Sequence, residues 1–221
     1  MVVQPSDTQR ENPEVPPMRL WRSVSALVCL LTACAPDPGP QAYFERGLEA
    51  YHKSRYMQAA KDFLKLAEKG DPKSQLYLAR MYANGEGFDI DYNQAAKWYF
   101  KAAEGGLMEA QRDLASLYAW GIGVTRDPVE SAYWFRRAAN QGSTEAQLAL
   151  AELLSADGAT KEQRIEAYSW YTIASRQVAS DQKATVLIDR RSLLPRMSRN
   201  DVVEAERRAY SWIPARERPA R

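Results

Sequence analysis

The sequence predicts an all-α fold, an α-solenoid of helix-turn-helix repeats. The first observation is a period: tryptophan, a small residue and leucine each recur at steps of 36 residues. The second is that apolar residues within a unit recur at i, i+4 and i+7 to i+8, which is one stripe of a helix. The third is a Gly-x-Gly turn inside two of the units, where glycine supplies positive φ. The recurring positions are Trp98, Trp134 and Trp170; Ser74, Ala110 and Ala146; and Leu78, Leu114 and Leu150.

The composition is that of an ordinary globular protein, with 45% hydrophobic and 26% charged residues among 221. A net charge of +2 is too small to indicate nucleic acid as the partner. The chain has one histidine, His52, and two cysteines, Cys29 and Cys34. A metal site with several His or Cys ligands is therefore excluded within one monomer, and a Ser-His-Asp hydrolase would depend on His52 alone. We expect no metal and no cofactor.

The amino-terminal residues have the pattern of an export signal. Residues 1–17 are polar and proline-rich, and we interpret them as an over-extended N-terminus, with Met18 as the expected start. In 18–33, Arg19 and Arg22 precede a short apolar run that ends in small residues, which is typical of a signal peptide. The run is far shorter than the ~20 residues of a membrane-spanning helix. The alternative is a buried helix that follows two arginines.

The end of this segment resembles a bacterial lipobox. Leu31-Thr32-Ala33-Cys34 matches all four positions, and the resemblance implies that Cys34 is the lipid attachment site and the first residue of the mature chain. Ala35 after it, rather than aspartate, implies the outer membrane, facing the periplasm. Stable anchoring takes more than one acyl chain. Prolines at alternate positions argue against a helix up to Pro40, so we expect residues 34–42 to be a tether.

Four repeat units follow the tether. We expect them at residues 43–70, 74–106, 110–142 and 146–178. In the second and third units, Asp91 and Asp127 are expected to cap the second helix, since Gln94 and Glu130 follow at capping-box spacing. The first unit has a shorter loop between its helices. The fourth has Asp157-Gly158-Ala159 in place of Gly-x-Gly, which leaves its loop shape open.

The unit from Ala110 to Gly142 is similar to the Sel1-like repeat. It reads Ala-x-x-x-Leu-Ala-x-Leu-Tyr-x-x-Gly-x-Gly-Val-x-x-Asp, continued after four residues by Ala-x-Trp-Phe-x-x-Ala-Ala-x-x-Gly. The Sel1-like repeat is a relative of the tetratricopeptide repeat. The resemblance extends over residues 43–178 and implies a right-handed solenoid whose role is protein–protein interaction.

Residues 181–213 are expected to form a C-terminal helical cap that covers the apolar face of the last repeat. Ser198 and Asp201 have capping-box spacing ahead of the second helix of this cap. Residues 214–221 are expected to be a flexible tail. Residues 176–221 hold 11 Lys or Arg and 6 Asp or Glu, a basic end that favours oriented docking or contact with anionic lipid. The alternative is a solvated helical face.

In a tetratricopeptide-like stack the first helix of each unit lines the concave surface, so residues opposite the core stripe form the expected partner-binding groove. Trp120 is unusual among them, because other units place Asn84 and Ala156 there, and an exposed tryptophan beside arginine is typical of a binding hot spot. The alternative is that Trp120 folds back over its own Gly-x-Gly loop. The predicted groove residues are Glu45, Glu49, Lys53, Leu76, Arg80, Asn84, Arg112, Ser116, Trp120, Leu148 and Glu152.

The repeated tryptophans could also stack on carbohydrate. They recur beside alanines in three of the four units, however, and this is how a solenoid core is filled, so we predict that they are buried. No pair of acids departs from the repeat, so we expect no catalytic residue.

The sequence thus predicts a non-enzymatic, periplasmic lipoprotein adaptor or scaffold that binds another protein or an extended peptide in its groove. Family analogy points to envelope or exopolysaccharide assembly as the specific role. The alternative is a cell-wall-active, polysaccharide-active or β-lactam-hydrolysing enzyme.

Overall fold

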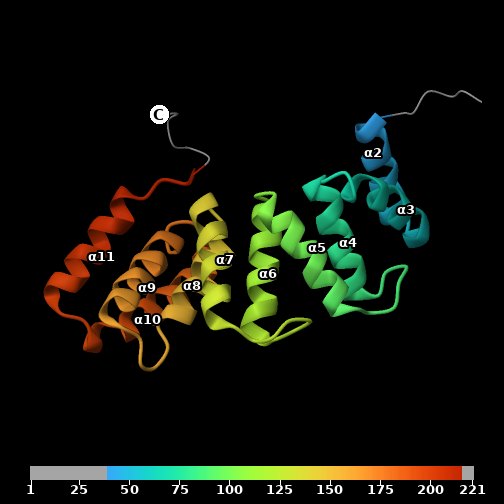
Figure 1. Cartoon of the computed structure of the whole chain (residues 1–221). Coiled ribbons are helices and arrows are strands. Elements are labelled where there is room, and N and C mark those ends of the chain that lie inside the picture. Colours follow the sequence, from blue (N-terminus) through green and yellow to red (C-terminus); the bar gives the residue numbers. More distant parts are fainter. Residues whose placement is uncertain (1–38, 216–221) are drawn as a thin grey trace, which may run out of the picture. The chain divides into compact units, whose positions relative to one another are not determined.

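The computed structural model describes residues 39–215, and every regular element among them is helical (Figure 1). The expected all-α fold is therefore confirmed. The predicted N-terminal segments 1–17 and 18–33, and Cys34, lie outside the described residues. The elements are α2 (Gly39–His52), α3 (Tyr56–Ala67), α4 (Pro72–Asn84), α5 (Tyr92–Glu104), α6 (Met108–Trp120), α7 (Pro128–Gln141), α8 (Thr144–Leu154), α9 (Lys161–Ala174), α10 (Ser180–Ser192), the 3-10 helix η1 (Leu194–Arg196) and α11 (Arg199–Ser211).

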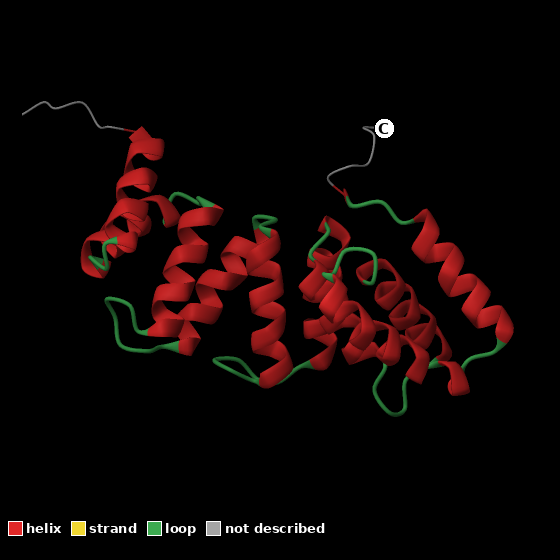
Figure 2. Cartoon of the chain, turned by 180° about the vertical axis from the view of Figure 1, so that it is seen from behind, coloured by secondary structure: helices red, strands yellow, loops and turns green. Residues whose placement is uncertain are grey.

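Neighbouring helices pack in the order expected of helix-turn-helix repeats (Figure 2). The first helix of a unit packs on its second helix in the pairs α4–α5, α6–α7 and α8–α9. Each second helix also packs on the first helix of the next unit, in the pairs α3–α4, α5–α6 and α7–α8. Because α4, α6 and α8 begin at Pro72, Met108 and Thr144, the 36-residue period of the sequence is the period of this stack.

The core is built from the residues that recur. Leu78, Leu114 and Leu150 are at most 1% exposed, and so are the pairs Ala102–Ala103 in α5 and Ala138–Ala139 in α7. These small residues let helices of neighbouring units approach closely. Trp134 and Trp170 are buried as predicted, with 2% and 6% of their surface exposed. The third recurring tryptophan, Trp98 in α5, is only half-buried. The ammonium of Lys101, on the next turn of the helix, lies over its indole ring.

A set of buried glutamines links one unit to the next. Each side-chain amide donates a hydrogen bond of 3.0–3.3 Å to a backbone carbonyl in the last turn of the second helix of the preceding unit. Each of these carbonyls also accepts a hydrogen bond from the backbone N–H of the glycine three residues further on, Gly70, Gly106 or Gly142. The glutamine therefore adds a second hydrogen bond at the helix end and ties one unit to the next. The donor and acceptor pairs are Gln75 with Ala67, Gln111 with Ala103, and Gln147 with Ala139.

Helix ends follow the sequence signals. Asp91 and Asp127 cap α5 and α7, because their carboxylates accept hydrogen bonds from backbone N–H groups of the first turn. Gly121 ends α6 in the left-handed conformation, with φ of +70°. In the fourth unit, whose loop shape the sequence does not determine, α8 is followed by Ser155 in a right-handed conformation, and Gly158 supplies the positive φ of +85° three residues later.

The N-terminal boundary differs from the sequence prediction. Helix α2 begins at Gly39, so residues 39–42 of the predicted tether are helical, and the expectation that no helix forms up to Pro40 is wrong at its end. Proline is tolerated in the first turn of a helix, because the N–H that it lacks would have no partner there. The helix then packs on α3 at Gly47, where an added Cβ would lie 2.8 Å from the ring of Phe63.

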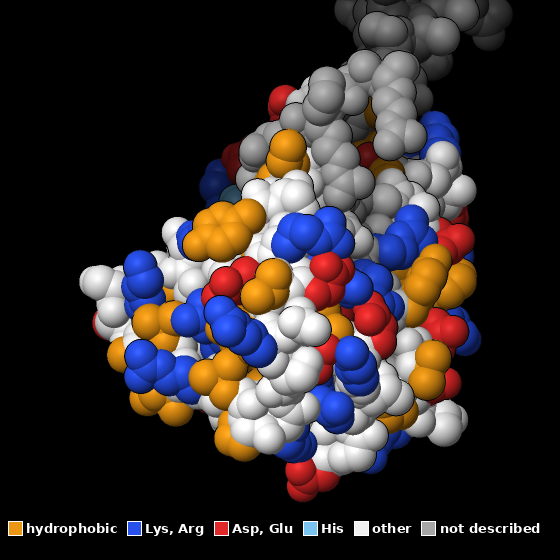
Figure 3. Space-filling view, turned by 90° about the vertical axis from the view of Figure 1, so that its left-hand side faces the viewer, with side chains coloured by type: hydrophobic (Ala, Val, Ile, Leu, Met, Phe, Trp, Pro, Cys, Tyr) orange, Lys and Arg blue, Asp and Glu red, His pale blue; other side chains and the backbone are white. Residues whose placement is uncertain are grey.

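The C-terminal helices pack on α9. Helix α11 lies against α9, where Ser169 donates a 3.0 Å hydrogen bond to the carbonyl of Ala205, and α10 packs on α9 as well. The predicted capping box of Ser198 and Asp201 is present at the start of α11. Figure 3 shows the face that these helices form, where Lys and Arg side chains gather with Asp and Glu between them. Helix α10 begins at Ser180, which continues the 36-residue period of the first helices.

Candidate partner-binding site

The predicted groove residues lie on the first helices or directly after them, and most reach solvent. The exposed ones are Glu45, Glu49, Lys53, Asn84, Trp120 and Glu152; the half-buried ones are Arg80, Arg112, Ser116 and Leu148. Leu76 is the exception, since it is 6% exposed and belongs to the core. Its assignment to the groove is wrong, because α4 packs against both α3 and α5 and leaves less of its surface accessible than the i, i+4 spacing suggests. The predicted groove residues of α4, α6 and α8 that do reach solvent are called the accessible strip below.

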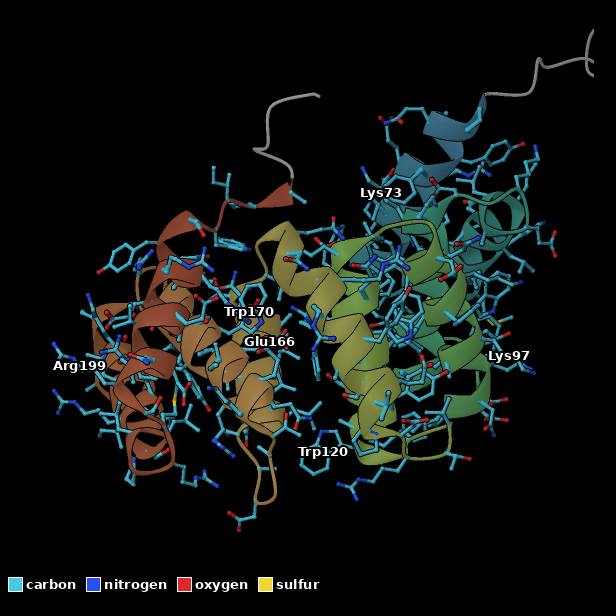
Figure 4. The ribbon with its side chains drawn as sticks, turned by 60° about the vertical axis from the view of Figure 1, so that its left-hand side comes forward. Lys73, Lys97, Trp120, Glu166, Trp170 and Arg199 are labelled. Carbon is cyan, nitrogen blue, oxygen red and sulfur yellow. The ribbon has the colours of Figure 1, made fainter. Side chains whose placement is uncertain are left out.

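Trp120 is the largest exposed apolar side chain on this strip. It is the last residue of α6, it is 77% exposed, and its indole stands off the end of the α6 ribbon (Figure 4). The alternative that it folds back over its own loop does not fit this exposure. That position is taken by Arg126, whose guanidinium donates a 3.0 Å hydrogen bond to the carbonyl of Ala119.

The two arginines of the strip share one carboxylate. Asp113 accepts a 3.3 Å contact from Arg80 and a 2.6 Å contact from Arg112, and so joins α4 to α6. Arg112 also approaches Glu145 of α8 at 3.9 Å. Burial, and next the charge of Asp113, raise the pKa of nearby Tyr99 to about 12. Because Asp113 occurs in only one unit, the repeat pattern does not indicate a role for it. The only indication in the sequence is that this acid directly follows Arg112.

The strip ends in an open groove of about 770 Å³ between α8 and α10. Two predicted residues, Leu148 and Glu152, line its α8 side. Its other side is formed by α10, which the sequence assigned to the cap, so this wall was missed. The 36-residue step from Thr144 to Ser180 marks the start of α10, but it does not indicate that this helix lines a groove.

The tryptophan of α9 has a structural role. Its indole N–H donates a 3.2 Å hydrogen bond to Glu166, whose carboxylate is held by both Nε and Nη2 of Arg136 (Figure 4). The ring of Trp170 packs edge-on against Trp212 of the C-terminal segment, at 5.9 Å between centroids. The indole is thus committed to the core and offers no face for stacking on a carbohydrate.

Metal ligation finds no support in residues 39–215, which contain no group of three or more His, Cys, Asp or Glu side chains placed to hold an ion. His52 is exposed at the end of α2, with its ring against that of Tyr51.

Of the helices in the described part of the chain, none combines the length and the apolar character needed to cross a bilayer.

Three segments match the family model of the Sel1 repeat: residues 72–107, 109–143 and 144–177. They coincide with the pairs α4–α5, α6–α7 and α8–α9. Among solved structures, the chain is similar to a Sel1 repeat protein from Oxalobacter formigenes, with a TM-score of 0.61 and 21% identity over 89% of this chain and 84% of that one.

It is also similar to c5321, a protective antigen of uropathogenic Escherichia coli with an SLR fold, with a TM-score of 0.60 and 24% identity over 86% of this chain. The chain spans less than half of that antigen, 44% of its length. A comparison with curated proteins found no match. At these identities the likeness shows the fold, which is an all-helical stack containing three Sel1 repeats.

Proposed function

We propose that this chain, with its three Sel1 repeats, is a non-enzymatic adaptor that binds another protein or an extended peptide along the accessible strip of α4, α6 and α8. The Sel1-repeat fold is a scaffold suited to protein–protein interaction. The observation that carries the proposal is Trp120, which is 77% exposed beside a strip with charges of both signs. Exposed tryptophan next to arginine has the composition of a binding hot spot.

The test is partner capture by in-cell cross-linking and mass spectrometry, followed by affinity measurement with the purified partner. Trp120→Ala should weaken binding by about 2 kcal/mol or more, roughly 30-fold, because truncating a hot-spot aromatic removes its contacts. Tyr210→Ala is the matched control, since this aromatic is 75% exposed on α11. Both variants should melt close to the unchanged protein. If the Trp120→Ala variant captures the partner as well as the unchanged protein does, the binding surface lies elsewhere.

The arginines of the strip make poorer test positions. Replacing Arg80 with glutamate would set two carboxylates side by side at Asp113, which loses an ion pair and adds repulsion. A loss of binding in that variant would then be mixed with a loss of stability. Arg80→Gln removes the charge and avoids the repulsion.

We place the adaptor at the outer membrane, facing the periplasm, with Cys34 acylated. Support comes from the lipobox-like Leu31-Thr32-Ala33-Cys34 and the two arginines ahead of it. Cys34→Ser should accumulate as an unprocessed or soluble species, because no acyl chain can be attached. Unchanged mass and membrane fractionation of this variant would contradict the anchor. Envelope or exopolysaccharide assembly is the specific role that we propose, and it rests on the family resemblance of the sequence alone.

An enzymatic role has a direct test. Purified protein incubated with peptidoglycan and with β-lactam substrates should leave both intact. Turnover of either substrate would replace the adaptor with the enzyme alternative.

A further inference from the structure

The groove between α8 and α10 combines an apolar floor with an acidic rim. The floor consists of Leu148, Val186 and the ring of Tyr171, of which the last two are 4% and 5% exposed. The rim carries four carboxylates, two from α8 and two from α10: Glu145, Glu152, Asp181 and Asp189. A groove of about 770 Å³ is large enough for several side chains of an extended segment.

The rim carboxylates are less neutralised than other acids of the fold. Among residues 39–215, no cation forms an ion pair with Glu152, Asp181 or Asp189, whereas Glu166 and Asp201 are both paired. Glu145 has only Arg112, at 3.9 Å.

Two arginines near the groove in sequence are engaged elsewhere, and two further cations of α10, Lys183 and Arg191, are exposed but do not line the groove. The guanidinium of Arg190 lies over the ring of Tyr168 and donates to Thr172 of α9. Arg196 pairs with Asp157 at 3.3 Å. The carboxylates of the rim therefore keep their negative charge exposed to the groove.

The negative charge also reaches the floor of the groove. Burial is the main cause that raises the pKa of Tyr171, and the charges of Asp189 and Glu152 raise it further. The phenol thus stays protonated and uncharged, and it can pack against an aliphatic chain. Long cationic side chains have this dual character, since they bury a methylene stem and keep a charged head at the rim.

We propose that this groove receives a lysine- or arginine-bearing stretch of the bound polypeptide, with the aliphatic stems on Leu148, Val186 and Tyr171 and the cationic heads among the four carboxylates. The proposal rests on the proposed function, because the groove continues the strip on α8 that includes Glu152. Charge complementarity is the argument for the occupant: opposite potentials steer association and exclude acidic segments.

The experiment measures binding of two short fluorescein-labelled peptides by fluorescence anisotropy to the full-length protein. One peptide repeats Lys-Ala-Ser, and the other repeats Gln-Ala-Ser. The lysine peptide should bind at least about tenfold more tightly, and the preference should weaken as salt is raised. The double variant Glu152→Gln with Asp189→Asn should lose about tenfold in affinity for the lysine peptide.

A matched control separates the groove from the net charge. Glu68→Gln with Asp89→Asn makes the same charge change at exposed residues outside the groove and should bind within about twofold of the unchanged protein. The proposal would be overturned by equal losses in both double variants or by the absence of a preference for the lysine peptide. It would also be overturned if millimolar Ca²⁺ displaced that peptide, because the groove would then be a cation site.

The outcome is distinguishable from failure of the proposed function. If Trp120→Ala abolishes partner capture while the groove variant leaves peptide binding intact, the strip is the binding surface and the basic specificity is wrong. If the groove variant loses the lysine peptide while Trp120→Ala keeps the partner, the groove stands and the strip at α6 does not.

Discussion

Single residues at equivalent repeat positions differ in their surroundings. Trp134 is 2% exposed because Phe100 of the preceding unit covers it edge-on at 5.9 Å. For Trp98 the corresponding position, 36 residues before Phe100, holds Leu64, a smaller side chain that is itself 39% exposed. The sequence predicts that these tryptophans face the same way, but the covering residue from the neighbouring unit decides how deeply each is buried.

Asp201 gives a prediction about acid stability. Its carboxylate pairs with Lys161 at 2.8 Å and accepts the backbone N–H of Ser198, and these contacts lower its pKa to about 2. A carboxyl whose pKa is lower in the folded state stabilises the fold above its unfolded pKa, near 4, and the stabilisation is lost as pH falls through the folded value.

We therefore expect Asp201→Asn to lower the melting temperature at pH 6 and to show a smaller further loss than the unchanged protein between about pH 4 and pH 2. Thermal unfolding followed by circular dichroism across this range measures the difference. Asp89→Asn, at an exposed loop carboxylate, serves as the control and should follow the unchanged protein. Parallel pH curves for Asp201→Asn and the unchanged protein would show that this pair contributes nothing.

The Gly-x-Gly turn has two functions at the scale of the helix pair. The first glycine ends the first helix in a left-handed conformation, with φ of +74° at Gly85 and +70° at Gly121. The second allows a close approach between units, since an added Cβ at Gly123 would lie 2.1 Å from the carbonyl oxygen of Tyr92 at the start of α5. The sequence predicted the first function from local conformation, and the second depends on a contact 31 residues away.

Gly123→Ala and Gly158→Ala separate these two effects. Both glycines have positive φ, of +69° and +85°, but nothing lies within 4 Å of the Cβ position at Gly158. Gly158→Ala should cost only the conformational strain, about 1–2 kcal/mol. Gly123→Ala should cost clearly more, because α5 and the loop must also move apart. Urea denaturation of both variants measures this, and equal losses would mean that the loop yields freely.

For the molecule as a whole, the period predicted from sequence identified the helices, while contacts between units decided the site. The first helices recur because Leu78, Leu114 and Leu150 recur. Helix α10 keeps the period at Ser180, yet it has Gln182 where α8 has an alanine, and nothing in the sequence indicates that it forms a wall of the acidic groove. Such a wall is created by packing and leaves no repeat signature.

Coupling through neighbours gives a prediction for the entire stack. Repeats contact only adjacent repeats, so a residue at a central interface holds both halves of the array together. Trp134 is such a residue, because it lies in α7 and contacts Phe100 of α5. Trp134→Ala should reduce the free energy of unfolding by about 3–5 kcal/mol, as truncation of a buried aromatic does, and should broaden the transition as the two halves uncouple.

Two further variants make this result specific to packing. The indole N–H of Trp134 finds no acceptor among residues 39–215, so Trp134→Phe removes no hydrogen bond and should cost less than the alanine variant. Trp120→Ala removes the same side chain from an exposed position and should change stability by no more than about 0.5 kcal/mol. Urea denaturation, followed by circular dichroism, ranks the three. An alanine variant at position 134 that unfolds like the unchanged protein would show that this tryptophan does not couple the units.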